Sequence, residues 1–522
     1  MKLSITKDKT SIVLKESTRE EFHQLKLHLT RKVENYFFKK RRKMGLWDGS
    51  IDHFKNGIIR YGLWKEVHRC CKEHGYKFDV DKSEFPFDLN IKREDVENFC
   101  QEFYKDYRVK PTQNNPEGLF MPYDHQIDSV YNMLKYKFGL IEVATAGGKS
   151  LIFGTFMFYI LKYINPNAKF LLIVPRMSLV TQFYDDIIDY NFGYNKEQKN
   201  PINIKIEEVF SDKPRKVRDG EEPNLYIGTY QSLINYPKEW YEKFDVVVTD
   251  ESHTAKSKSL ETILTKTFGT AKYRLGLSGT YPDIQSAEYL TIQSLMGPKI
   301  VNVKSKFLME KGLISEVKIN VMILNYNEDE FAERVYRIKK NGGGQKAYQL
   351  EKEYAQKSLK RKVFFRKLVE KFKNNSLILF HTIEYGTMLY EYLRDNISNK
   401  HFYYIDGSTK KDKREKIKKL MEITDDKPKI LIASFGTFST GINIKAIMNV
   451  VFADSFKSDQ IIRQSIGRGL RLHKDKNKLI VFDIVDNFLP KYTNILYKQY
   501  QVRLEKIYKK QGFTVNEIKL KI

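Results

Sequence analysis

Cysteine is scarce in this chain, which has three among its 522 residues. Three thiols are too few for a disulfide framework, and this scarcity is typical of a reducing compartment. Long apolar runs are missing too, because the most apolar segment, residues 151–164, is shorter than the roughly 20 residues of a membrane-spanning helix. Residues 1–21 lack the apolar core of a signal peptide. We therefore expect a soluble, cytoplasmic protein with no membrane partner.

Negative charge is in short supply relative to positive charge. Lysine and arginine number 91, aspartate and glutamate number 65, and the formal net charge is +26. This excess favours a polyanionic partner, most simply nucleic acid, although a protein can be basic without binding one. The hydrophobic fraction of 41% is sufficient for packed cores.

Apolar patterning divides the chain into five parts. Residues 1–110 are predicted to form a small N-terminal α+β domain, and residues 119–304 and 363–487 two blocks in which apolar strands alternate with helices. Such alternation is typical of parallel sheets covered on both faces, so the fold class is α/β. Residues 305–362 connect the blocks, and residues 488–522 form a C-terminal extension. The predicted strands are 138–143, 170–175, 224–229, 245–248 and 274–280 in the first block, and 376–381, 401–405, 429–433, 449–453 and 479–483 in the second.

A loop of small residues lies between the predicted strand 138–143 and the predicted helix 151–164. This arrangement predicts a polyphosphate site, because backbone N–H groups and the helix N-terminus can surround phosphate oxygens. Lys149 would contact the β- and γ-phosphates, and the Ser150 hydroxyl would bind Mg²⁺. An ordinary turn that happens to hold a lysine is the alternative. The site comprises Ala144, Thr145, Ala146, Gly147, Gly148, Lys149 and Ser150.

Two carboxylates, Asp250 and Glu251, follow the predicted strand 245–248. Ligands of parallel α/β sheets bind at the carboxyl ends of strands, so this pair is predicted to lie near the phosphate loop. Asp250 would bind the same Mg²⁺ as Ser150, and Glu251 would orient and deprotonate the attacking water. The alternative is a polar turn at the end of a strand.

Arginines of the second block complete this prediction. Arg468 and Arg471 are three residues apart, so both can face one way on a helix. We expect them to contact the γ-phosphate, where an arginine is worth about 10³ to 10⁵ in rate in related chemistry. A basic face on a surface helix is the alternative.

Five consecutive cations precede Trp47 in the N-terminal segment. Such a cluster can bind a phosphate backbone and place an aromatic ring against a base or sugar. A solvated loop with Trp47 in the domain core is the alternative. The cations are Lys39, Lys40, Arg41, Arg42 and Lys43.

In their order along the chain, these motifs resemble those of superfamily 2 helicases of the DExH type. The resemblance covers residues 119–487 and rests on residues 144–150, Asp250-Glu251-Ser252-His253, Leu277-Ser278-Gly279-Thr280 and residues 464–471. It implies two tandem RecA-like domains that use ATP and Mg²⁺ to drive nucleic-acid unwinding. The catalytic residues it implies are Lys149, Asp250, Glu251, His253, Gln464, Arg468 and Arg471.

The same resemblance implies further contacts. Gln126 would contact adenine and Gly441 would contact ATP, while Ala146 stands where many relatives have glycine. The residues implied to contact nucleic acid are Pro175, Arg176, Gly228, Thr229, His381, Ser434, Phe435 and Gly436.

A narrower resemblance, to the recombination helicases of bacteriophages, extends over nearly the whole chain. It rests on residues 45–49 after the basic run, on the loop 434–441 and on the chain length. It implies a monomer that works on branched DNA by fork regression and Holliday-junction migration, in recombination, repair and replication. Recombination or single-strand-binding proteins would be partners, in the host cytoplasm. An RNA helicase, the motor subunit of a restriction-type complex and a basic binding protein with an inactive ATP site remain alternatives.

Overall fold

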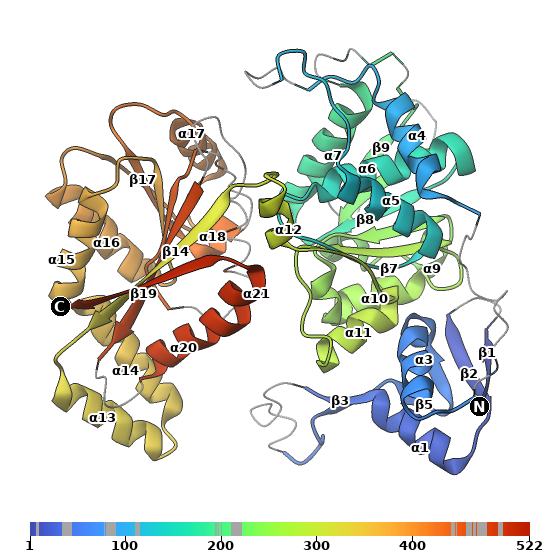
Figure 1. The fold of residues 1–522 in the computed structure, drawn as a ribbon, viewed down its shortest axis with the longest axis horizontal. Coiled ribbons are helices and arrows are strands. Elements are labelled where there is room, and N and C mark those ends of the chain that lie inside the picture. The colour runs from blue at the N-terminus through green and yellow to red at the C-terminus, as the bar shows by residue number, and fades with distance from the viewer. Residues whose placement is uncertain are drawn as a thin grey trace. The chain divides into compact units, whose positions relative to one another are not determined.

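The chain forms two compact units, Met1–Val303 and Lys304–Ile522, each built on a seven-stranded sheet (Figure 1). No described helix is both long and apolar enough to cross a lipid bilayer. The computed structural model describes residues 1–6, 10–33, 44–77, 79, 90–109, 115–193, 196, 198–199, 201–209, 222–439, 444, 446–455, 462, 466, 478–488 and 494–522.

All seven strands of the first large sheet are parallel, in the order β13-β7-β12-β11-β8-β10-β9. Every strand predicted for this block is present. The polar strand β9 and the strand β13 were not predicted. The strands are β7 (Phe138–Val143), β8 (Phe170–Val174), β9 (Ile206–Val209), β10 (Leu225–Thr229), β11 (Val246–Thr249), β12 (Tyr273–Ser278) and β13 (Lys299–Val303).

Helices cover both faces of this sheet, which explains why its strands are apolar throughout. In Figure 1, α5, α6 and α7 lie on one side of the sheet and α10 and α11 on the other. The helices of this block are α4 (Arg93–Phe103), α5 (Asp124–Tyr136), α6 (Lys149–Tyr159), α7 (Met177–Phe192), α8 (Tyr230–Leu233), α9 (Lys238–Tyr241), α10 (Lys258–Lys266) and α11 (Ala287–Met296).

The N-terminal residues form a small α+β structure that packs directly on α11. Its core is continuous with Phe138 and Leu290 of the α/β block. A Cβ at Gly62 would lie 2.2 Å from the carbonyl oxygen of Gln293, so only glycine allows this approach. Arg31 donates to the carbonyl of Ile284 at 2.6 Å. The elements are β1 (Lys2–Ile5), β2 (Ser11–Glu16), α1 (Arg19–His28), β3 (Thr30–Lys32), β4 (Ser50–Asp52), β5 (Phe54–Lys55), β6 (Ile58–Arg60) and α3 (Trp64–Glu73).

The contact of the N-terminal structure with α11 predicts a pH dependence of stability. Burial, and next the charge of Arg60, lower the pKa of His53 to about 4, and its ring lies 3.3 Å from Thr291 Oγ1. Because the folded pKa is lower than the unfolded one, the unfolded chain binds the proton first as pH falls. We expect stability to be lost between pH 6.5 and 4, by about 3 kcal/mol.

Thermal unfolding of the wild type and of His53→Gln across this pH range would test the expectation. The difference between the two proteins isolates His53 from carboxylates that titrate in the same range. Parallel pH profiles for the two proteins would contradict it.

The second unit also has a parallel seven-stranded sheet, in the order β16-β17-β15-β18-β19-β14-β20. Every strand predicted for the second block is present. The sheet also includes two strands from segments that we placed outside the block. The strands are β14 (Glu316–Asn325), β15 (Ser376–Phe380), β16 (His401–Ile405), β17 (Lys429–Ser434), β18 (Asn449–Phe452), β19 (Lys478–Asn487) and β20 (Thr514–Lys521).

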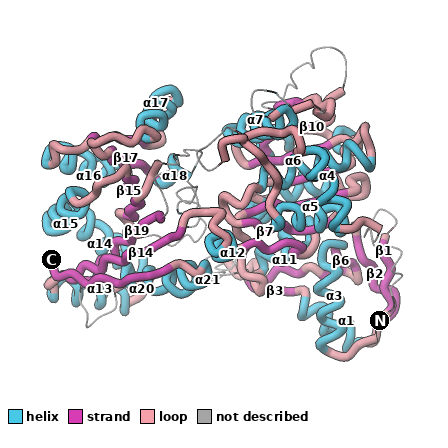
Figure 2. The backbone as a smooth tube through the Cα atoms, turned by 45° about the horizontal axis from the view of Figure 1, so that its top comes forward, coloured by secondary structure: helices cyan, strands magenta, loops and turns pink. Residues whose placement is uncertain are grey.

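Helices α15 and α16 line one face of this sheet (Figure 2). Arg361 of α15 forms a buried ion pair with Asp486 of β19 at 2.8 Å. The helices of this unit are α12 (Ser305–Glu310), α13 (Asp329–Lys340), α14 (Gly344–Lys357), α15 (Leu359–Glu370), α16 (Ile383–Asn396), α17 (Lys411–Met421), α18 (Phe435–Ser439), α20 (Ile495–Arg503) and α21 (Lys509–Gln511).

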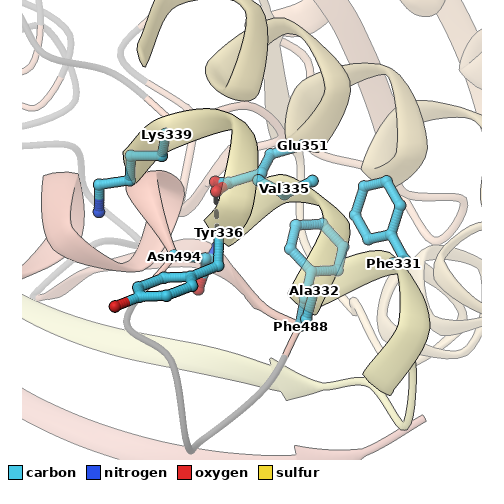
Figure 3. A pocket seen from close by; sticks show the side chains of 8 residues that line it. All are labelled: Phe331, Ala332, Val335, Tyr336, Lys339, Glu351, Phe488 and Asn494. Atoms are coloured by element: carbon cyan, nitrogen blue, oxygen red, sulfur yellow. Dashed lines mark hydrogen bonds between the residues drawn. The ribbon is translucent and has the colours of Figure 1, made fainter. Parts of the chain in front are cut away.

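A small pocket beside α13 and α14 holds Glu351, whose carboxylate accepts from Asn494 Nδ2 at 3.2 Å (Figure 3). The same carboxylate accepts from the backbone N–H groups of Ile495 and Leu496, both at 2.9 Å. These are the first N–H groups of α20, which otherwise lack partners within the helix. None of our predicted site residues lines this pocket, and the role of Glu351 is to anchor α20.

Candidate active site

The motif residues of the first unit meet at one edge of its sheet. Strands β7, β12 and β11 are parallel neighbours, so the loops that follow them emerge side by side. A Cβ at Gly279 would lie 3.4 Å from Thr145 Oγ1 and 3.7 Å from Lys149 Nζ. The loop after β12 therefore lies against the small-residue loop after β7.

The small-residue loop turns tightly before α6 begins. The N–H of Gly147 donates to the carbonyl of Ala144 at 2.9 Å, and Ala146 and Gly148 have φ angles of 68° and 85°. Gly148 is the N-cap of α6, and no side chain caps its first N–H groups. These donors are thus available to an anion at a helix N-terminus, which suits a phosphate.

Gln126 and His125 of α5 support this loop. Gln126 Nε2 donates to the carbonyl of Gly147 at 3.2 Å, and His125 Nε2 lies 3.0 Å from the same oxygen. A Cβ at Gly148 would lie 2.2 Å from Gln126 Nε2, so the glycine is required for this contact. The structure therefore places Gln126 against the phosphate loop, and the adenine contact that the resemblance implies for this residue stays a prediction.

Lys149 and Ser150 are the first two residues of α6. Lys149 Nζ donates to the carbonyl of Val143 at 3.4 Å, and Ser150 Oγ lies 2.9 Å from the hydroxyl of Tyr190. Tyr190 was not singled out from the sequence, since one tyrosine among 33 gives no signal. Both polar groups thus lie next to the phosphate loop.

Asp250 is 5% exposed and follows β11. Burial, and next the charge of Glu251, raise the pKa of Asp250 above its ordinary value, whereas the nearby charge of Lys149 lowers it. Its Oδ1 atom is buried and has no hydrogen-bond partner within the described chain. A buried carboxylate oxygen without a donor is what a divalent cation would satisfy, so the residues fit Mg²⁺.

His253 links Glu251 to the loop after β12. Its Nδ1 lies 2.9 Å from Ser278 Oγ and 3.3 Å from Glu251 Oε2. Ser278 donates its only hydroxyl proton to the carbonyl of Thr280 at 2.7 Å. His253 must therefore carry its proton on Nδ1 and act as the donor. It thereby links the Asp250-Glu251-Ser252-His253 motif to the Leu277-Ser278-Gly279-Thr280 motif.

Four nucleic-acid contacts were predicted for the first α/β block, all of them on described residues, and one of the four has a well exposed side chain. Arg176 is exposed at the N-cap of α7, next to the half-buried Pro175. A Cβ at Gly228 would lie 3.0 Å from Val209 Cβ, so Gly228 allows close packing inside the sheet. Thr229 is 3% exposed and accepts from the N–H of Ser232 at 3.2 Å, which caps α8. The four contacts stay predictions.

The second unit brings its predicted contacts to the carboxyl edge of its own sheet. His381 is exposed after β15, and its N–H donates to Asp454 at 2.8 Å. Ser434 and Phe435 are buried, with the Ser434 hydroxyl bonded to Thr437 Oγ1 at 2.8 Å. Gly436 is exposed, with open space around its Cα. These contacts also stay predictions.

The structure also clarifies the environment of Trp47. The side chain is half-buried, and its indole N–H donates to the carbonyl of Ser50 at 2.7 Å. Trp47 is therefore neither fully buried in the core nor fully exposed. Other predicted residues lie outside the described part of the chain: Lys39, Lys40, Arg41, Arg42, Lys43, Gly441, Gln464, Arg468 and Arg471.

Helix α17 (Lys411–Met421) carries exposed basic residues that we did not single out from the sequence. It begins at the carboxyl edge of the second sheet, where Arg414 donates to the carbonyl of Gly407 at 2.9 Å. Its exposed lysines recur every three residues, a spacing that could have revealed one helical side. They are Lys410, Lys413, Lys416 and Lys419.

Two family models match the chain, the first within the first unit and the second within the second unit. Residues 119–283 match "Type III restriction enzyme, res subunit", and residues 360–473 match "Helicase conserved C-terminal domain". With these matches and the relative described next, the chain belongs to the superfamily 2 helicases of the DExH type. It is an ATP-driven helicase with two tandem RecA-like domains, as the motifs predicted.

Among known proteins, the chain is similar to the ATP-dependent DNA helicase uvsW of Enterobacteria phage T4. The two are 28% identical over 470 residues, which cover 89% of this chain and 87% of the relative. The putative ATP-dependent helicase IRC3 of Saccharomyces cerevisiae is 21% identical over 66% of this chain and 48% of its own length.

Two solved structures are similar to this chain, and the first of them shows the shared fold. The ATP-dependent Type ISP restriction-modification enzyme LlaBIII, bound to DNA, has a TM-score of 0.52 at 14% identity, over 87% of this chain and 36% of that chain. The crystal structure of T4 UvsW has a TM-score of 0.48 at 24% identity and covers all of both chains.

Proposed function

We propose that this ATP-driven helicase acts on branched DNA, in fork regression and Holliday-junction migration. The observation that carries the proposal is the match to the phage T4 DNA helicase over 89% of the chain. Residues 119–522 make up only about three quarters of the chain, so this match includes part of the N-terminal segment, which neither family model covers. Similarity outside the common helicase core favours a shared substrate.

At the active site, we propose roles that combine the motif resemblance with the geometry described above. Lys149 and the first N–H groups of α6 would bind the phosphates of ATP, and the resemblance implies that Gln126 contacts the adenine. Ser150 and Asp250 would hold Mg²⁺, which when bound neutralises phosphate charge. Glu251 orients the attacking water and accepts its proton, while His253 holds Glu251 near the loop after β12. The roles assigned to Gln464, Arg468, Arg471 and Gly441 stay predictions.

The cellular setting is part of the proposal and rests on the resemblance to the recombination helicases of bacteriophages. We propose that the protein works as a monomer in the cytoplasm of a phage-infected host, in recombination, repair and replication. Recombination proteins and single-strand-binding proteins are the partners we propose.

The decisive experiment compares three labelled substrates in the presence and absence of ATP and Mg²⁺. They are a four-way DNA junction, a DNA fork and an RNA duplex of equal length. We expect ATP-dependent processing of the junction and the fork, and little processing of the RNA. Equal or faster processing of RNA would favour an RNA helicase. ATP-dependent movement along plain duplex DNA, without junction processing, would favour a restriction-type motor.

Helix α17 provides a separate test of nucleic-acid binding. We expect the triple variant Lys413→Gln, Lys416→Gln and Lys419→Gln to weaken DNA binding and to flatten its salt dependence. Each phosphate contact that is lost on duplex DNA lowers the slope of log K against log salt by about 0.9. Binding measured at several salt concentrations gives both quantities.

A charge-matched control is available in the same unit. Lys367, Lys371 and Lys373 are exposed lysines on or just after α15, near the amino end of β15 and thus away from the carboxyl edge. The corresponding triple glutamine variant should change the salt slope little. Equal effects of the two triple variants would show that only net charge matters, and α17 would lose its assignment.

A further inference from the structure

Tyr281 follows the Ser278-Gly279-Thr280 motif, and its hydroxyl lies beneath the catalytic edge of the first sheet. The phenolic oxygen is 2.5 Å from Ser252 Oγ and 2.8 Å from the carbonyl oxygen of Gly276. Ser252 directly follows Asp250 and Glu251 in the chain. The tyrosine therefore connects the loop after β12 to the turn that carries both catalytic carboxylates.

Ser252 is completely buried, and its hydroxyl also donates to the carbonyl of Leu277 at 3.0 Å. An oxygen–oxygen distance of 2.5 Å requires a proton between the two atoms. Because Ser252 donates its only hydroxyl proton to Leu277, the Tyr281 hydroxyl must be the donor to Ser252 Oγ. Burial keeps the pKa of Tyr281 well above its usual range, so the phenol remains protonated at neutral pH.

The strand beneath this contact is shaped to accommodate it. A Cβ at Gly276 would lie 2.7 Å from Ser252 Oγ and 2.5 Å from Met296 Sδ. The glycine in β12 therefore leaves room for the serine hydroxyl to reach Tyr281. Glu251 adopts a left-handed backbone conformation, with φ of 48°. A non-glycine residue in that region depends on its surroundings to hold it, and Ser252 is the next residue.

We propose that Tyr281 is a positioning residue for ATP hydrolysis. Through Ser252 it holds the Asp250–Glu251 turn in the geometry in which Glu251 faces the attacking water. The inference depends on the assignment of this edge as the ATP site and is independent of whether the substrate is DNA or RNA. A failure of the junction assay would leave it standing.

The test is Tyr281→Phe, which removes the hydroxyl and keeps the ring. We expect kcat for ATP hydrolysis to fall about three- to tenfold, which corresponds to the loss of one buried hydrogen bond. KM for ATP should change less than twofold, because the phosphate loop is untouched. A changed KM with an unchanged kcat would overturn the proposal.

A double-mutant cycle with Ser252→Ala separates positioning from general loosening of the fold. If the two hydroxyls act as one unit, the double variant should be no slower than the slower single variant. Multiplicative losses would mean that the hydroxyls act independently and would overturn the proposal.

Tyr241→Phe is the matched control, because its hydroxyl donates to the carbonyl of Leu233 at 2.5 Å and the residue is fully buried in the same block. It removes a similar hydrogen bond before the amino end of β11, at the opposite end of that strand from the catalytic turn. We expect similar thermal unfolding for the two tyrosine variants and a fall in kcat for Tyr281→Phe alone. An equal fall in kcat for both would assign the effect to loss of stability and overturn the proposal.

Discussion

Lys149→Ala is expected to lower the rate of ATP hydrolysis by roughly a hundredfold or more, since a cation that stabilises developing phosphate charge in a site shielded from water contributes on that scale. Lys149 Nζ donates a long hydrogen bond of 3.4 Å to the carbonyl of Val143. Because this bond is weak, the ammonium group can move to a phosphate at little cost in free energy. Binding of nucleic acid should remain close to that of the wild type. A phosphate-release assay and a binding titration measure the two effects.

Lys272→Ala is the control for this prediction. Lys272 is an exposed lysine at the amino end of β12, on the opposite edge of the same sheet, where it pairs with Asp245 at 2.9 Å. The substitution makes the same change in charge and should leave turnover nearly unchanged. Full activity of Lys149→Ala would contradict the assignment of the loop to phosphate binding.

Glu251→Gln is expected to lower kcat by about 10² to 10⁴, the range over which general base catalysis contributes. The amide has nearly the shape of the carboxylate and can still accept a hydrogen bond from His253, so the turn should keep its geometry. ATP should therefore bind with similar affinity and be hydrolysed slowly. Single-turnover hydrolysis and nucleotide titration distinguish the two steps.

Glu261→Gln provides the comparison, since Glu261 lies on α10 of the same block and pairs with Arg60 at 2.9 Å. Its turnover should resemble that of the wild type. If Glu251→Gln hydrolysed ATP at the normal rate, another residue would have to be the base. A normal rate for both Lys149→Ala and Glu251→Gln would show that ATP hydrolysis takes place elsewhere in the protein.

The sequence predicted the two sheets well because their central strands are apolar on both faces. Strands such as β8 and β15 are completely buried, and a continuous apolar run is the direct signature of that environment. It also predicted that Lys149 and Asp250 would come together, because the carboxyl ends of parallel strands share one edge.

Three edge strands, β9, β13 and β20, were missed because their burial is partial. In β20, polar and apolar residues alternate and most positions are exposed, so its eight residues resemble a solvated segment. Its pairing with β14 over residues 318–325 depends on contacts that are distant in sequence. The C-terminal extension therefore contributes to the second sheet, which local patterning could not reveal.

Other residues were missed for a different reason, because the partner that gives each one its role is distant in the sequence. Tyr281 matters only through Ser252, 29 residues earlier, and Gly62 only through the backbone of Gln293. Neither residue type is unusual in its local context. The roles of Gly228 and Thr229 in close packing and capping likewise became visible only with Val209 and Ser232 in place.

The attachment of the N-terminal structure to α11 has a mechanical consequence. With Gly62 against Gln293 and Arg31 bonded to Ile284, the described part of the N-terminal structure is fixed to the block that carries the phosphate loop. A nucleic-acid segment bound to the N-terminal structure would therefore move together with that block. The distance between that bound segment and the nucleotide would therefore stay constant. Lengthening a surface loop within the N-terminal structure should leave this distance unchanged.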